Sequence, residues 1–145
     1  MNLTTVENAI ITQLGTVITD MKIAAWPADV RDYLLSHPNG AILVHYLGST
    51  YAEPEPNNQP KIVHDRLSEW SIYISKKVLK QIDLNPHQDV YTSIENVRTA
   101  LTGYTIATLS DASVMWPTRD RLVYEEKGFW IYEMIFVFSY PEAES

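Results

Sequence analysis

The segment that most constrains the fold is GFWIYEMIFVFSY, residues 128–140, because it is apolar on both faces of a strand. Successive side chains of a strand point to opposite faces of the sheet. One face carries Trp130, Tyr132, Met134, Phe136 and Phe138, and the other carries Phe129, Ile131, Ile135 and Val137 beside Glu133. Such a strand needs cover on both sides. Either the sheet curls over itself, or a neighbouring chain covers the second face.

Apolar residues at helical spacing predict two long helices. The first runs from about Leu3 to Asp20, with Thr4 and Glu7 at the spacing of a capping box. The second lies within NPHQDVYTSIENVRTALTG, residues 85–103, between an Asn-Pro pair and a glycine. A shorter helix is expected in PADVRDYLLSHP, residues 27–38, because prolines stand at both of its ends.

Other segments have the composition of strands. Strands are expected at Met21–Trp26, at Gly40–Ser49 and within SVMWPTRDRLVYEE, residues 113–126, with a turn at Lys127-Gly128. A further strand, RLSEWSIYISKKV, alternates and indicates one core face and one wetter face. Its core face carries Trp70, Ile72 and Ile74, and its wetter face carries Glu69, Ser71, Tyr73 and Ser75.

The order of these elements predicts the fold class. Strand pairs that are separated by helices favour an α+β fold. We expect a mostly antiparallel sheet built from hairpins, with two long helices packed on one face and a short extra helix. The length of 145 residues fits one domain, residues 1–145, with a protruding polar loop at 51–61.

That loop, YAEPEPNNQPK, joins two of the predicted strands and is long for a hairpin connection. It contains three prolines and no catalytic signature. Proline restricts the unfolded chain, so this arm can be ordered against a partner at low entropic cost. We therefore predict that it contacts another protein, through Glu53, Glu55, Asn57, Asn58 and Lys61.

Charge and cysteine content exclude several classes of function. The formal net charge is −7, which disfavours binding of nucleic acid through a broad basic surface. The chain has no cysteine, which rules out disulfide scaffolds, thiol nucleophiles and zinc–thiolate sites. No apolar stretch reaches the roughly 18 residues of a membrane span, and no signal peptide is visible, so we expect a soluble protein made inside the cell.

No catalytic or metal-binding motif is found. The four histidines, His37, His45, His64 and His87, are not at metal-ligand spacing and are interpreted as packing or surface residues. The paired carboxylates at 53/55 and 125/126 are interpreted as solvated loop or turn acids. The sequence therefore predicts no enzyme activity, no cofactor and no metal.

Two further features of the sequence involve charged residues. Glu133 has apolar neighbours and needs a cation if it is buried, which Arg119, Arg121 or Lys127 could supply across the hairpin. It is interpreted as a structural ion pair or an exposed strand residue. Arg119, Asp120 and Arg121 form a charge cluster that either binds acidic groups of a partner or protects a sheet edge from strand addition.

The chain as a whole resembles the tail terminator, or tail-completion, proteins of long-tailed phages, especially Mu-like contractile phages. The resemblance covers most of the chain and rests on the order of its segments. These are TTVENAIITQLGTVI, GAILVHYLGSTY before a polar loop, WSIYIS, YTSIENVRTALTGY and GFWIYEMIFVFSY.

The resemblance implies assembly rather than catalysis. Such proteins are α/β sandwiches that form hexameric rings at the head-proximal end of the tail in the virion. The ring ends growth of the tail tube and contacts the tail tube protein, the tail sheath protein and the head connector or neck protein. DNA passes through the ring without specific binding. The alternatives are a neck or head-completion protein and a non-viral protein-binding module.

Overall fold

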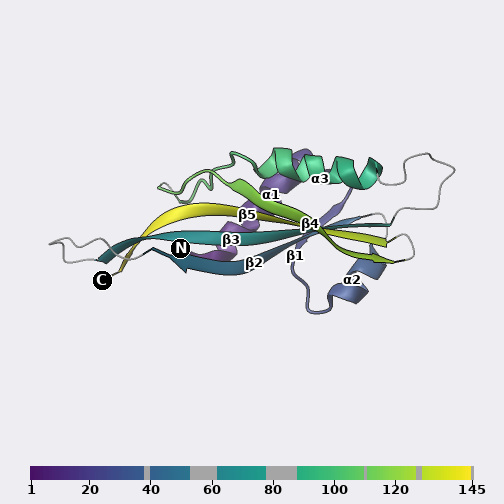
Figure 1. Ribbon diagram of the computed structural model, residues 1–145, viewed down its shortest axis with the longest axis horizontal. Helices are drawn as coiled ribbons and strands as arrows, with labels where there is room; N and C mark the ends of the chain where they lie inside the picture. The colour runs from purple at the N-terminus through teal and green to yellow at the C-terminus, as the bar shows by residue number, and fades with distance from the viewer. Residues whose placement is uncertain (38–39, 53–61, 78–87, 110, 127–128, 145) are drawn as a thin grey trace.

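The structure, a computed structural model of the 145-residue chain, describes residues 1–37, 40–52, 62–77, 88–109, 111–126 and 129–144. The five strands of its sheet follow the order β1-β2-β3-β5-β4. The strands are β1 (Lys22–Ala25), β2 (Ala41–Tyr51), β3 (Ile62–Lys77), β4 (Trp116–Glu126) and β5 (Phe129–Glu144), and the helices are α1 (Leu3–Val17), α2 (Val30–Ser36) and α3 (Gln88–Leu101). In Figure 1, α3 lies above the sheet, α2 lies below it and α1 crosses behind it. Helices α1 and α3 contribute to one core cluster, and α2 contributes to a separate one.

The predicted fold class is wrong. The sheet is mixed, because β1 pairs with β2 in parallel while the other three pairings are antiparallel. In place of two long helices, the described residues form three short ones, of 15, 7 and 14 residues. The parallel pair arises because α2 lies between β1 and β2 in the chain. Parallel neighbours need a crossover connection, which a helix commonly supplies, whereas a sheet built from hairpins has none.

Helix α1 is shorter than predicted. It ends at Val17 rather than Asp20, and Ile18 is already extended, with φ −108° and ψ 113°. Residues 16–19 read TVIT, and four β-branched side chains in succession disfavour continuation of a helix. The predicted capping box is also wrong, because Thr4 lies inside the helix. The cap is Asn2, whose side chain accepts a hydrogen bond of 3.1 Å from the amide three residues later.

The main core lies between the sheet and helices α1 and α3. As the alternation predicted, Trp70, Ile72 and Ile74 of β3 are fully buried there. They pack in one cluster with Val6, Ile10 and Leu14 of α1, Val97 and Leu101 of α3, and Met134, Phe136 and Phe138 of β5. The C-terminal end of α3 is closed by Gly103, whose φ of 81° favours glycine.

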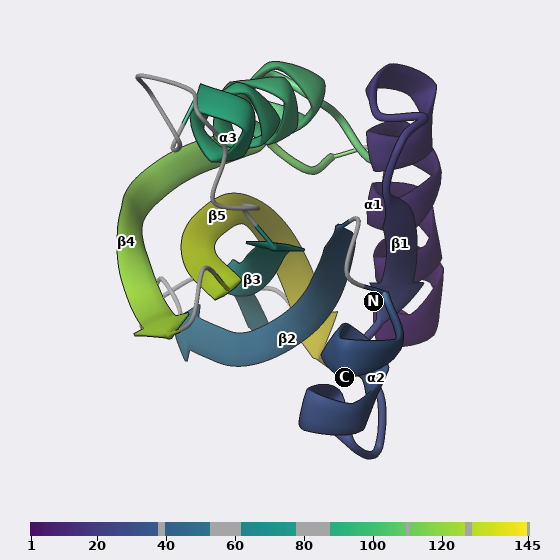
Figure 2. The same cartoon turned by 90° about the vertical axis from the view of Figure 1, so that its right-hand side faces the viewer.

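The opposite face of the sheet is more deeply buried than the sequence predicted. Ser71 and Ser75 of β3 are buried rather than wet. A second, smaller apolar cluster forms around Leu34 of α2 and Ala41 and Leu43 of β2. Figure 2 shows the strands curling strongly when viewed along the sheet. Ile135 and Val137 are only 7% and 2% exposed, so the chain itself covers the second face of the central part of β5.

Candidate functional site

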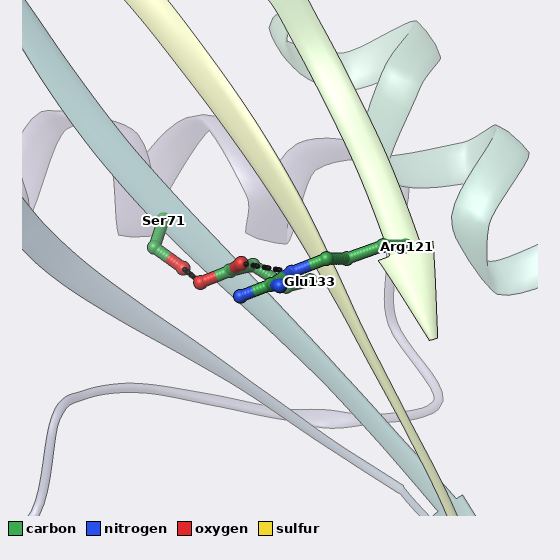
Figure 3. Close-up of polar contacts among 3 residues, drawn as sticks. All are labelled: Ser71, Arg121 and Glu133. Atoms are coloured by element: carbon green, nitrogen blue, oxygen red, sulfur yellow. Dashed lines mark hydrogen bonds and ion pairs between the residues drawn. The ribbon is translucent and has the colours of Figure 1, made fainter. Parts of the chain in front are cut away.

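A polar cluster lies on this second face, at the centre of the sheet. Figure 3 shows three of its members, Glu133 on β5, Ser71 on β3 and Arg121 on β4. The fourth is Tyr73, also on β3. The register places both Tyr73 and Arg121 directly opposite Glu133, on the two neighbouring strands. Because the strand order is β3-β5-β4, these side chains meet at one carboxylate. No spacing in the sequence indicates this contact.

Both carboxylate oxygens of Glu133 accept hydrogen bonds. Ser71 Oγ donates to Oε2 at 2.8 Å, and Arg121 Nε donates to Oε1 at 3.1 Å. The Tyr73 hydroxyl donates a further hydrogen bond to the same carboxylate. The Glu133 side chain is 6% exposed, while the Arg121 side chain is 56% exposed, so the pair lies at the border between core and solvent.

The pKa of Glu133 follows from these contacts. Burial raises it, because a carboxylate loses hydration, but the hydrogen bonds from Ser71 and Arg121, the charge of Arg121 and the hydrogen bond from Tyr73 together outweigh burial. The net effect is a pKa below the ordinary value of 4.5. For Tyr73, burial and then the charge of Glu133 raise the pKa of the phenol. Glu133 is therefore ionised and Tyr73 neutral at pH 7.

This arrangement fits a structural role. The prediction that a nearby cation pairs with Glu133 is confirmed, and Arg121 supplies it. Lys127, the third candidate, lies outside the described residues. The carboxylate serves as an acceptor for groups on both neighbouring strands, so a shift of either strand by one residue would move its donor to the other face. The cluster thus holds the register of three strands.

The predicted contact residues Arg119, Asp120 and Arg121 lie on β4, at the edge of the sheet. All three are exposed. Arg119 and Arg121 stand opposite Ile135 and Glu133 of β5 and therefore share a face. Asp120 stands opposite Met134, on the other face. Their role in binding a partner stays a prediction.

The same edge strand carries exposed apolar residues. Leu122, Val123 and Tyr124 are each 44–46% exposed, and Trp116 is 38% exposed. Charged residues, proline and bulges are the usual protections of a sheet edge. On β4, Pro117 and the charged cluster at 119–121 stand in the first half of the strand. In the second half the pairing with β5 shifts register between Leu122 and Tyr124, and Glu125 follows. Features that protect an edge from strand addition therefore occur in both halves of β4.

A second surface is the far end of the sheet, where β2, β3 and β5 extend beyond the helices (Figure 1). We call this three-stranded extension the blade, comprising residues 49–52, 62–67 and 139–144. Its side chains that the structure describes are exposed or half-buried. Arg66 stiffens it, donating to Ser49 Oγ at 2.9 Å and to the Tyr46 hydroxyl at 3.1 Å. The Arg66 guanidinium also lies 5.3 Å from the centre of the Tyr51 ring.

The predicted arm leaves the sheet at the blade. The Ala52 amide still donates to the Asp65 carbonyl at 2.8 Å, as the last observed link between β2 and β3. Glu53, Glu55, Asn57, Asn58 and Lys61, the predicted contact residues of the arm, lie outside the described residues. Their role in protein contacts stays a prediction.

Two of the four histidines take part in packing. His45 lies beside Trp26, with ring centres 4.6 Å apart. His37 stacks on Tyr33 at 4.4 Å, and its Nδ1 hydrogen bonds to the Tyr33 carbonyl. His87 and the side chain of His64 lie outside the described part of the chain. Among the residues that are described, no group of three or more His, Asp or Glu side chains is placed to hold a metal ion.

Sequence reasoning missed three members of these sites. Ser71 and Tyr73 were placed on the wetter face of their strand, and Arg66 was not singled out. A serine among large apolar residues was the available signal for Ser71, but its partner is fixed only by the pairing of β3 with β5.

Within the described helices, none is long and apolar enough to cross a membrane.

Comparison with known proteins identifies one family whose sequence model matches this chain. The sequence model described as "Gp37 protein" matches residues 10–144. No curated protein matches the chain. One similar solved structure is titled "Virion of native gene transfer agent (GTA) particle". It is 14% identical with a TM-score of 0.49, and the match covers 94% of each chain.

Proposed function

This chain belongs to the Gp37 protein family, and from that premise we propose that it is a structural protein of a phage virion. In this role it caps the tail tube as a ring, ends tail polymerisation, and joins the tube and sheath to the head connector. The ring is a homo-oligomer, with six subunits as the resemblance to tail terminator proteins implies. It acts through protein surfaces and without catalysis, cofactor or membrane.

The observation that carries this proposal is the blade. Strand β3 has 16 residues, which corresponds to roughly 50 Å at the rise of a strand. Its outer end belongs to the blade, whose described side chains are exposed or half-buried, and of these only Tyr140 packs against the main core. An ordered extension that adds little to the core of its own chain is suited to contact another protein. The proline-rich arm of residues 53–61 is connected to this extension.

The test is imaging of the cognate particle at a resolution that identifies side chains. We expect the chain as a ring at the head-proximal end of the tail tube, with the blade against the tube, the sheath or a neighbouring subunit. Density in the head connector would instead favour a neck or head-completion protein. Absence of the chain from the particle would refute the virion role.

A deletion of residues 53–59 tests the arm separately. Changes in loops are usually tolerated by a fold, so the melting temperature is expected to stay unchanged while completed particles are lost. A matched control replaces the same residues with a Gly/Ser segment of equal length, which separates loss of the arm's side chains from shortening of the connection. Normal particles from both variants would remove the arm from the proposal.

A further inference from the structure

The two segments that the sequence predicts to contact a partner carry opposite charges. The arm of residues 53–61 contains Glu53 and Glu55, and β4 presents Arg119 and Arg121 on one face of the sheet. We propose that this arginine pair binds the two glutamates in the arm of a second copy of the chain. The inference rests on the ring that is part of the proposed function, and it names the partner of both segments.

The arginine pair is accessible and only partly neutralised. Both residues are exposed. Among the described residues, no hydrogen bond or ion pair involves the side chain of Arg119, whereas Arg121 donates through Nε to Glu133. The Arg121 side chain is still 56% exposed, and a guanidinium has further N–H donors besides Nε. Two cations therefore stand beside a single buried carboxylate, and this part of the face can accept more negative charge.

The spacing of the two pairs of charges matches. Arg119 and Arg121 are two residues apart on a strand, so their Cα atoms are separated by about 6–7 Å. Glu53 and Glu55 are also two residues apart, and each directly precedes a proline. Because a residue before proline is restricted to extended backbone, we expect a similar separation of the two glutamates. Two charge-assisted hydrogen-bonded pairs can therefore form at once.

Side chains rather than backbone groups make this contact. Pro54 and Pro56 have no backbone N–H, so this part of the arm cannot add to the sheet as a regular strand. Trp116 stands opposite Val137, on the same face of β4 as the arginine pair, and is 38% exposed. Aromatic side chains line the surfaces that bind proline-rich segments. The face thus offers an apolar contact for the prolines beside two cations for the glutamates.

Chain length excludes the same contact within one copy. The arm leaves β2 at the level of Pro141 of β5, in the blade (Figure 1). Arg119 stands opposite Ile135, six residues away along β5, which corresponds to about 20 Å. Strands β3 and β5 also lie between β2 and β4. Glu53 follows the last described residue before the arm by about 4 Å of chain, and Glu55 by at most about 11 Å. The two glutamates therefore cannot both reach the arginine pair of their own chain.

Cysteine crosslinking tests the contact, because the natural chain has no cysteine. Purified Arg119→Cys protein is mixed with Glu53→Cys or with Glu55→Cys protein and oxidised across a series of concentrations. Both mixtures are needed, since the direction of the arm decides which glutamate meets Arg119. We expect a disulfide-linked dimer in one mixture at several times the yield from any single protein. The matched control replaces Arg119→Cys by Asp120→Cys, which is also exposed on β4 but lies on the opposite face.

A double variant distinguishes contact between copies from contact within one copy. It combines Arg119→Cys with the cysteine at whichever arm position crosslinks to it. We expect a ladder of linked oligomers, and a disulfide closed within single chains would overturn the inference. Yields in both mixtures no higher than in the Asp120→Cys control, at every concentration, would overturn it as well.

Charge reversal in the cysteine-free chain gives an independent test. Arg119→Glu, or Glu→Arg at the arm position that crosslinks to it, should raise the dissociation constant for self-association roughly threefold. Both changes in one chain should restore the natural value. Arg31→Glu is the matched control, because it makes the same change of charge at an exposed position on α2. Sedimentation velocity makes the measurement, and equal weakening by Arg31→Glu, or no self-association of the natural chain, would contradict the contact.

Failure of this inference is distinguishable from failure of the proposed function. A ring of this chain in the virion without the crosslink between arm and arginine pair would refute the contact and leave the function intact. Crosslinked oligomers of a chain that is absent from the virion would do the reverse.

Discussion

The two faces of the sheet are stabilised in different ways. The face toward α1 and α3 is covered by apolar side chains, with Trp70, Phe136 and Phe138 fully buried. The face toward α2 combines a smaller apolar cluster with a buried carboxylate that accepts hydrogen bonds from both neighbouring strands. Apolar burial is not directional, whereas hydrogen bonds to a buried carboxylate are. The first face therefore supplies most of the stability, and the second fixes how the strands align.

The largest expected effect belongs to the apolar face. Phe136→Ala should lower the free energy of unfolding by about 3–5 kcal/mol, because it removes a fully buried ring and leaves a cavity. The measurement is denaturant unfolding followed by circular dichroism. Leu122→Ala serves as the control, since its side chain is 46% exposed and its loss should change the free energy by less than about 0.5 kcal/mol. Equal losses in the free energy of unfolding for the two variants would contradict the conclusion that the apolar face supplies most of the stability.

On the second face, removal of the Arg121 cation should lower the free energy of unfolding by less than Phe136→Ala does. Arg121→Met leaves Glu133 buried without its positive partner, which for a fully buried pair costs about 3–5 kcal/mol. The Arg121 side chain is 56% exposed and two other donors remain, so we expect about 1–2 kcal/mol. Arg119→Met is the matched control on the same strand and face, with an expected change of less than about 0.5 kcal/mol. If both variants lost the same stability, the ion pair would contribute nothing specific.

The carboxylate makes the second face sensitive to acid. Because the folded pKa of Glu133 lies below its ordinary value of 4.5, its ionised form stabilises the fold fully above that value, and this contribution is lost as the pH falls through the folded pKa. Glu133→Gln should therefore be less stable than the natural chain at pH 7. The difference should shrink as the pH is lowered below 4.5. Urea unfolding at several pH values measures it, and a difference independent of pH would contradict the assignment.

The smallest expected effects on stability come from substitutions at two buried serines of β3. Ser71 donates to Glu133 at 2.8 Å, whereas Ser75 Oγ is buried and has no hydrogen-bond partner among the residues that the structure describes. Ser71→Ala should cost about 1 kcal/mol or somewhat more, while Ser75→Ala should be neutral or stabilising by up to about 1 kcal/mol. Thermal unfolding of the two variants side by side makes the measurement. A loss at Ser75 equal to the loss at Ser71 would mean that burial alone, rather than hydrogen bonding, separates them.

The sequence predicted the apolar face well because its signal is local. Alternation in β3 identified Trp70, Ile72 and Ile74 as core residues, and all three are fully buried. Helical spacing likewise predicted the helix whose apolar stripe is Val90, Ile94, Val97 and Leu101, of which Ile94 is half-buried and the other three are fully buried. These patterns depend only on the period of one element, so no knowledge of its neighbours is needed.

The second face was predicted less well because it depends on which strands are neighbours. Alternation placed Ser71 and Tyr73 on the side away from the core, which is correct, but it could not show that α2 and the curled sheet would bury that side. Arg121 was one of three cations proposed for Glu133, and only the register chose among them. The parallel pairing of β1 was missed for the same reason, since it is a relation between two strands rather than a property of either.

The position of β5 has a consequence for how the protein folds during synthesis. This strand lies between β3 and β4 in the sheet, yet it follows both of them in the chain. Domains are made from the N-terminus onward at about 5–20 residues per second. Until residues 129–144 have left the ribosome, β3 lacks its longest pairing, and β4 lacks the one strand with which it pairs in the described part of the chain. The sheet is therefore completed only after translation has passed its last strand, and a copy truncated before Phe129 cannot form it. Synthesis itself thereby keeps incomplete copies from presenting a finished sheet to other proteins.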